Sequence, residues 1–153
     1  MKYIYALDLA LGSTGVAIFN DDGQHVWLQT IDTKKVKSVP LKLVHIANEL
    51  LKLEDDFAPK IIIIERGFSR FNRSTQQIFR VHGVVNYIFA NYPQIYIPPA
   101  TVKKVVGGKG NINKDDLRKI INMEYPAIKF KNNDESDAMA VGLAYFIQER
   151  IQS

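Results

Sequence analysis

The apolar residues of this chain fall either into short unbroken runs or into stripes with helical spacing. Such an alternation is typical of α/β proteins, in which the runs form buried strands and the stripes form the inner faces of helices. The most apolar run, Ile61–Ile64, indicates a strand that is buried on both faces. The pattern predicts strands over 2–9, 15–20, 24–32, 60–65 and 95–97. It predicts helices over 40–54, 74–91, 100–106, 113–123 and 135–151.

Turn residues between these elements indicate how the strands pair. Gly12 and Gly15 mark the first turn, and Asn20-Asp21-Asp22-Gly23 is a strong hairpin signal. The first three strands are therefore expected to form an antiparallel meander, and the last two are reached through helices by right-handed crossovers. We expect one α/β domain over 1–153, with a five-stranded mixed sheet and helices on both faces. The first and fourth strands can be neighbours in such a sheet.

The composition indicates a folded protein without cysteine. With 153 residues, 46% of them hydrophobic, the chain can bury about two-thirds of the surface of its unfolded state, which argues against disorder. The lack of cysteine excludes disulfides and thiolate metal sites and fits a reducing compartment. The sequence has no secretory signal and no run long enough to span a membrane. We therefore expect a soluble cytoplasmic protein without a membrane partner.

Basic residues are concentrated in two stretches, although the net charge of +4 is small. Residues 66–80 hold arginines and phenylalanines but no acid, and residues 103–119 hold mostly lysines. Basic stretches with interleaved aromatics suit phosphate backbones and exposed bases, so both are candidate nucleic-acid contacts. Their basic residues are Arg66, Arg70, Arg73 and Arg80, followed by Lys103, Lys104, Lys109, Lys114, Arg118 and Lys119.

Four acidic residues lie where buried apolar elements begin or end. Asp8 ends the first predicted strand and Glu65 ends the fourth, while Asp134 and Asp137 lie three residues apart at the start of the last helix. Strand ends and a helix start can meet at one point of an α/β fold. Carboxylates gathered there would repel one another unless a divalent cation shares them. The four acids therefore predict a metal-dependent active site.

Each acid also has a structural interpretation. Asp8 could begin the glycine turn, and Glu65 could be a solvated strand end. Asp134 and Asp137 could serve as an N-cap and a first-turn acid. These alternatives give no reason for two acids to interrupt the most apolar strands. Other polar residues are expected to be structural: Glu135 as a solvated residue, Ser13 and Thr14 as turn residues, and His25, His45 and His82 as satisfied or surface side chains.

Four segments, in order along the chain, form a specific pattern. They are Asp8 with Leu11-Gly12-Ser13-Thr14-Gly15; Glu65-Arg66-Gly67-Phe68; Tyr96-Ile97-Pro98-Pro99-Ala100-Thr101-Val102-Lys103-Lys104 with Gly108-Lys109-Gly110 and Lys114; and Asp134-Glu135-Ser136-Asp137-Ala138-Met139-Ala140. Together they resemble the motifs of the ribonuclease H-like superfamily and, more narrowly, of the RuvC family of Holliday-junction resolvases. The resemblance extends over almost the whole chain and implies a ribonuclease H-like fold.

The resemblance implies a homodimeric endonuclease that depends on Mg²⁺, with Mn²⁺ able to substitute and two ions in each active site. Such an enzyme would cut Holliday junctions and other branched DNA, including three-way junctions and flaps, leaving 5′-phosphate and 3′-hydroxyl ends. By position, the resemblance makes Asp8, Glu65, Asp134 and Asp137 catalytic metal ligands. It makes Phe68 the aromatic residue at the branch point and assigns phosphate contacts to Lys103, Lys104 and Lys114. Beside these we expect Arg66, Arg70, Arg73 and Lys109 to bind DNA.

A two-fold dimer is expected to be built partly on the helix over 74–91, because the apolar face of this helix is wider than one sheet surface needs. The alternative is that this helix is central to its own core. The residues of the face are Ile78, Val81, Val85, Ile88 and Phe89. A two-fold pair of active sites would suit symmetric incision of a four-way junction.

Three other functions are compatible with parts of the pattern. A non-catalytic branched-DNA-binding module would use the basic stretches, but it needs no acids at buried strand ends. A ribonuclease H-type enzyme would use the same carboxylates on RNA–DNA hybrids. The segment from Asp8 to Gly15 also resembles sugar kinases and actin-like ATPases, but this chain is too short for their two domains. The length of this chain and the arginines after Glu65 instead fit a compact phage-type resolvase in a bacterial or phage-infected cell.

Overall fold

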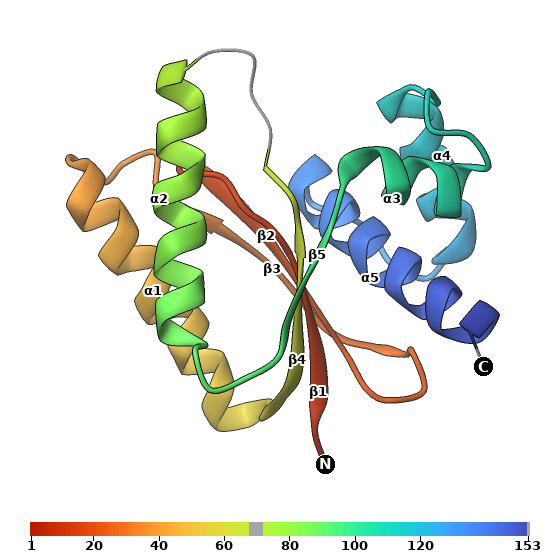
Figure 1. Cartoon of the computed structure of the whole chain (residues 1–153), viewed down its shortest axis with the longest axis horizontal. Coiled ribbons are helices and arrows are strands. Elements are labelled where there is room, and N and C mark those ends of the chain that lie inside the picture. Colours follow the sequence, from red (N-terminus) through yellow and green to blue (C-terminus); the bar gives the residue numbers. More distant parts are fainter. Residues whose placement is uncertain (68–71, 153) are drawn as a thin grey trace.

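The computed structural model describes residues 1–67 and 72–152, except for the side chains of residues 72–74 (Figure 1). All the predicted strands and helices are present, with ends that differ by a few residues. The strands are β1 (Tyr3–Asp8), β2 (Ser13–Phe19), β3 (His25–Asp32), β4 (Pro59–Glu65) and β5 (Gln94–Ile97). The helices are α1 (Val39–Asp56), α2 (Asn72–Ile88), α3 (Pro99–Gly107), α4 (Lys114–Glu124) and α5 (Asn133–Gln152).

The strands form one mixed sheet in the order β3-β2-β1-β4-β5. β1 pairs antiparallel with β2, and β2 pairs antiparallel with β3. β4 lies parallel to both β1 and β5. The first and fourth strands are therefore neighbours, and the predicted fold class is confirmed.

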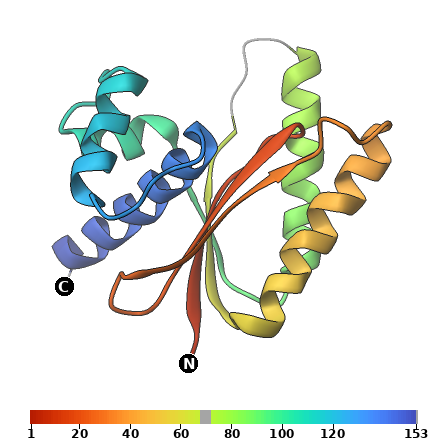
Figure 2. The same ribbon diagram turned by 180° about the vertical axis from the view of Figure 1, so that it is seen from behind.

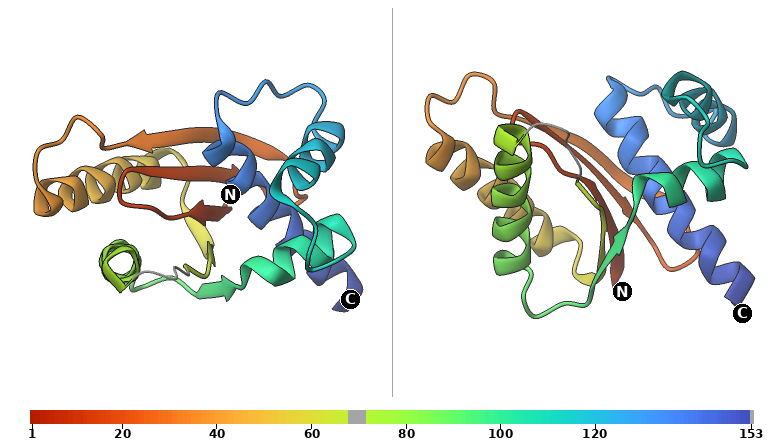
Figure 3. Two further views of the ribbon diagram at one scale, coloured as in Figure 1. Left: turned by 90° about the horizontal axis from the view of Figure 1, so that it is seen from above. Right: turned by 45° about the horizontal axis from the view of Figure 1, so that its top comes forward.

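Helices cover both faces of the sheet (Figures 2 and 3). α1 and α2 lie on one face, and α5 crosses the other with α3 and α4 beside it. The isoleucines of β4 alternate between the two sides: Ile61 and Ile63 pack under α5, whereas Ile62 and Ile64 pack under α1 and α2. This strand is buried on both faces, as predicted. None of the described helices is both long and apolar enough to cross a membrane.

The apolar stripe of α2 packs into the core of its own chain. Val81, Val85 and Phe89 are fully buried against the sheet, and Ile88 packs beside them. The prediction that this stripe forms the dimer contact is therefore wrong, because the stripe is needed to cover the sheet. The outer face of α2 has a different apolar set: Phe79, Gly83 and Tyr87 are all exposed.

Two glycines allow α5 to approach the sheet closely. A Cβ atom on Gly15 would lie 2.0 Å from the carbonyl oxygen of Asp134, and one on Gly142 would lie 2.2 Å from the ring of Phe19. A side chain at either position would push the helix and the sheet apart. The contact at Gly15 holds the first turn of α5, which contains Asp134 and Asp137, against β2.

Candidate active site

Two carboxylates end neighbouring strands at one edge of the sheet. Leu7 of β1 pairs with Ile64 of β4, so the next residues, Asp8 and Glu65, end these parallel strands side by side. Both acids are partly buried, and they line a cavity of about 310 Å³ together with Lys114. Their proximity follows directly from the order of the strands.

Burial and mutual repulsion disfavour the charged forms of these two acids. Burial raises the pKa of Asp8 to about 6, and the negative charges of Asp137 and Asp134 contribute to this rise. Burial raises the pKa of Glu65 to about 7, with the charge of Asp8 as the next cause. The positive charge of Lys114 lowers both pKa values but does not offset the rise. The four acids therefore form one electrostatic cluster.

The first turn of α5, on the face of the sheet to which Asp8 and Glu65 also point, contributes the other two acids of this cluster. The hydroxyl of Ser13 on β2 donates a hydrogen bond to the carboxylate of Asp134. Asn132 caps the helix through its side-chain oxygen, so Asp134 does not act as the N-cap. The hydroxyl of Thr14 donates to the carbonyl oxygen of Ala10 at 2.8 Å, which confirms its role in the turn.

Two cationic side chains of α4 contact Asp137. The guanidinium of Arg118 donates to both carboxylate oxygens, with Nε 3.3 Å from Oδ1 and Nη2 3.2 Å from Oδ2. The Nζ atom of Lys114 lies 3.5 Å from Oδ2. Arg118 is predicted from sequence only as part of a basic stretch, without its contact with the acids. Its position four residues after Lys114 is the signal that could have found it, since this spacing puts both side chains on one face of a helix.

The chemistry of this cluster fits a divalent cation such as Mg²⁺, because carboxylate oxygens are hard ligands and these repel one another. In the described part of the chain, however, no three His, Cys, Asp or Glu side chains are arranged to hold a metal ion. Two of the four acids have protein partners instead: Asp134 contacts Ser13, and Asp137 contacts Arg118 and Lys114. A cation that binds Asp137 must therefore share its carboxylate oxygens with these partners or displace them.

Several of the predicted DNA-contacting residues lie beside the carboxylates. Lys103 and Lys114 line a small cavity beside Glu65. The others are exposed: Arg66 directly after β4, Lys104 in α3 and Lys109 in the loop that follows α3. Phe68 and Arg70 lie outside the described residues, as does the side chain of Arg73.

Glu135 is buried, with only 3% of its surface exposed, so the prediction of a solvated residue is wrong. Its carboxylate accepts a hydrogen bond from the backbone N–H of Lys131 at 3.0 Å and another from the hydroxyl of Thr30 at 3.4 Å. These contacts resemble a capping box and tie the start of α5 to β3. Glu135 therefore has a structural role beside the cluster.

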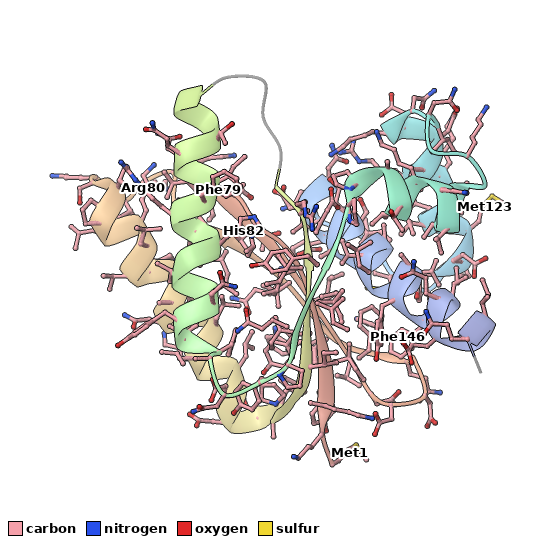
Figure 4. The ribbon with its side chains drawn as sticks, in the orientation of Figure 1. Met1, Phe79, Arg80, His82, Met123 and Phe146 are labelled. Carbon is pink, nitrogen blue, oxygen red and sulfur yellow. The ribbon has the colours of Figure 1, made fainter. Side chains whose placement is uncertain are left out.

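His82 is buried as well, and its Nε2 has no hydrogen-bond partner among the described residues. The prediction of a satisfied or surface histidine is wrong for this residue. Its ring stacks on Tyr96, with centroids 5.8 Å apart, and lines a cavity of about 480 Å³ with Phe79 and Gly67. Figure 4 labels His82 and Phe79, which both extend from α2. Burial lowers the pKa of His82, so the ring is neutral at pH 7.

A sequence model of the family described as crossover junction endodeoxyribonuclease RuvC matches residues 4–145. The chain belongs to this family. The resemblance predicted from the four segments is therefore confirmed. RuvC-family nucleases are metal-dependent, which agrees with the chemistry of the carboxylate cluster.

Curated RuvC-family relatives match over most of their length. The crossover junction endodeoxyribonuclease RuvC of Pseudothermotoga lettingae is 30% identical over 147 residues, which cover 92% of this chain and 89% of the relative. That of Gluconobacter oxydans is 28% identical over 151 residues, covering 95% of this chain and 90% of the relative.

Solved structures of resolvases share the fold. Thermus thermophilus RuvC in complex with a Holliday junction substrate has a TM-score of 0.84 at 17% identity, over 99% of this chain and 97% of that chain. The resolvase of Fowlpox virus, solved with Holliday junction DNA, has a TM-score of 0.57 at 15% identity, over 97% of this chain and 99% of that chain. At these identities the likeness shows the fold, which is ribonuclease H-like.

Proposed function

We propose that this protein is an endonuclease that cuts Holliday junctions and related branched DNA at the carboxylate cluster. The observation that supports this most is the meeting of Asp8 and Glu65 with Asp134 and Asp137, which come from two strands and one helix. A binding module would gain nothing from acids whose pKa values are raised by burial and repulsion. Family membership supports junction DNA as the substrate.

In the proposed reaction, water attacks the phosphorus atom and the bond to the 3′ oxygen breaks, leaving 5′-phosphate and 3′-hydroxyl ends. We assign Asp8, Glu65, Asp134 and Asp137 as ligands of two Mg²⁺ ions, with Mn²⁺ able to substitute. Bound there, the ions would activate the water and stabilise the leaving oxygen. The remaining catalytic contribution is positioning of the DNA backbone.

Basic side chains around the cluster would position that backbone. Lys103 and Lys114 lie beside Glu65, where they can bind the phosphates next to the cut. Arg66 lines the same cavity as Asp8 and Glu65, and Lys104 and Lys109 are exposed; all three can bind flanking phosphates. Phe68, Arg70 and Arg73 stay predicted DNA contacts. We also propose that residues 1–153 act as one domain in the cytoplasm of a bacterial or phage-infected cell, in keeping with the bacterial relatives.

The test is a panel of four-way, three-way, flap, linear and RNA–DNA hybrid substrates, each with Mg²⁺, Mn²⁺ or EDTA. We expect cleavage of the four-way junction with either metal, weaker cleavage of three-way junctions and flaps, and none in EDTA. Binding of the junction without cleavage in either metal would instead support a non-catalytic module. Preferential cleavage of the hybrid would support a ribonuclease H activity.

We propose a homodimer whose contact is the outer face of α2. Phe79 and Tyr87 are 59% and 83% exposed, and Gly83 lies between them at helical spacing. A small residue at the centre of an apolar face lets two helices approach closely, and two-fold symmetry would pair this face with itself. This face replaces the buried stripe predicted from sequence.

Gly83→Arg is expected to convert the dimer to a monomer without unfolding the chain. A Cβ atom at Gly83 meets nothing within 4 Å among the described residues, so there is room for a side chain to leave the helix outward, where a partner would be obstructed. Sedimentation at micromolar concentration should show a dimer for the wild type and for Gly83→Ala but a monomer for Gly83→Arg. A wild-type protein that stays monomeric with and without junction DNA would contradict the proposal.

A further inference from the structure

Arg118 and a divalent cation need the same carboxylate oxygens. The guanidinium contacts both Oδ1 and Oδ2 of Asp137, and Lys114 also contacts Oδ2. The side chain of Asp137 is only 13% exposed, so little of it is free for another partner. Binding of a cation through Asp137 and binding of Arg118 are therefore competing events.

Arg118 also faces a second environment, which is basic and polar. It lines a cavity of about 470 Å³ between α4 and the segment before α5, together with Asn122, Lys129 and Lys131. None of the described residues that line this cavity is acidic. A basic, polar cavity of this kind suits a phosphate group, because phosphate oxygens accept charge-assisted hydrogen bonds from arginine in a bidentate geometry. The cavity and the carboxylate cluster meet at Arg118.

We propose that this cavity binds a backbone phosphate of the DNA substrate and that Arg118 acts as a positioning residue, moving from Asp137 to that phosphate. The inference rests on the proposed nuclease function. Without DNA, Arg118 stabilises the carboxylate cluster and competes with metal for Asp137. With DNA, the phosphate competes with Asp137 for Arg118, so Asp137 is released for the cation. Metal binding and DNA binding thus strengthen each other by the same factor.

The first test is a Mn²⁺ titration of the DNA-free protein by calorimetry. Arg118→Met removes the competing charge but keeps side-chain length, and it is expected to tighten Mn²⁺ binding about tenfold, equivalent to 1.4 kcal/mol. Lys103→Met is the matched control, because Lys103 acts on Glu65 electrostatically but has no ion pair with Asp137 among the described contacts. It should tighten Mn²⁺ binding by no more than about twofold.

The second test adds a linear duplex, which a junction-selective nuclease binds without cutting. The duplex is expected to tighten Mn²⁺ binding to the wild type several-fold and to have a smaller effect on Arg118→Met. Lys131→Met should reduce the effect of the duplex while leaving DNA-free Mn²⁺ affinity unchanged, since Lys131 lines only the basic cavity.

Unchanged or weaker Mn²⁺ binding by Arg118→Met would overturn the proposal, because Arg118 would then organise the site rather than compete for it. If Arg118→Met does not fold, Lys114→Met tests the same competition through its single contact with Asp137 and should tighten Mn²⁺ binding two- to fivefold, about 0.4–1 kcal/mol. Lack of Mn²⁺ binding by the wild type and every variant would instead refute the proposed metal site.

Discussion

Asp8→Asn is expected to lower junction cleavage at least about a thousandfold, or about 4 kcal/mol of transition-state stabilisation. Asp8 lies between Glu65 on the neighbouring strand and the two acids of α5, so it is the carboxylate best placed to be shared by two ions. Asparagine keeps the shape of the side chain but loses the charge that holds a cation. Cleavage is measured under single-turnover conditions with saturating protein and Mg²⁺.

Binding of the junction should change little in the same variant. Affinity for DNA comes mainly from phosphate contacts by lysines and arginines, which Asp8→Asn leaves in place. Lys52→Gln is a useful control because Lys52, on α1, forms an ion pair with Glu49 and belongs to neither basic stretch. Retention of more than about a tenth of wild-type cleavage, a loss of only ~1.4 kcal/mol, would remove Asp8 from the metal site.

The same substitution should stabilise the metal-free protein at high pH. The folded-state pKa values of Asp8 and Glu65, about 6 and about 7, lie above those of the unfolded chain. The folded protein therefore binds protons more tightly than the unfolded chain does. The charges of these two acids do not destabilise the fold below about pH 4, and their destabilising effect is complete above about pH 7. Asp8→Asn removes the part of this destabilisation that comes from the charge of Asp8, which is at most about 3 kcal/mol.

Denaturant unfolding in EDTA at pH 5 and pH 8 measures this effect. The free energy of unfolding of the wild type should fall as the pH rises, and the fall should be smaller in Asp8→Asn. Equal pH dependence in the two proteins would mean that neither burial nor the neighbouring charges raise the pKa of Asp8 in the folded state.

Residue patterns in the sequence were sufficient to predict the fold and the meeting of the strand-end acids. Runs such as Ile61–Ile64 specify buried strands, and parallel neighbours bring Asp8 and Glu65 to one edge whatever the details of packing. The same reasoning placed Asp134 and Asp137 at a helix start, because both depend only on local periodicity and on the order of elements.

Contacts between side chains distant in sequence could not be predicted in this way. Ser13 meets Asp134 across 121 positions, and Arg118 meets Asp137 only because α4 packs beside α5. The burial of Glu135 depends equally on the position of Thr30 in β3. Local patterns give the face of a helix on which a residue lies, but not the element that covers that face, and this is also why the dimer face of α2 was assigned wrongly.

Gly15→Ala is expected to lower the free energy of unfolding by about 2 kcal/mol, or ~4–8 °C in melting temperature. The added methyl group would lie 2.0 Å from the carbonyl oxygen of Asp134 and 3.2 Å from Cβ of Ala138. The first of these atoms belongs to the backbone, so no rotamer change relieves the clash and the first turn of α5 must move. Thermal unfolding followed by circular dichroism measures the loss.

The same shift should reduce cleavage about a hundredfold at temperatures where Gly15→Ala is fully folded, because displacement of catalytic groups by about 1 Å has effects of this size. Asp134 and Asp137 would move away from Asp8, which pairs with Gly15 across β1 and β2. Gly12→Ala is the matched control in the same turn region, since a Cβ atom there meets no atom of the described part of the chain within 4 Å. Gly12→Ala should keep both stability and cleavage near wild type. If Gly15→Ala is as stable and as active as Gly12→Ala, close packing of α5 on β2 does not position the carboxylates, and the contacts of Ser13, Lys114 and Arg118 hold the cluster instead.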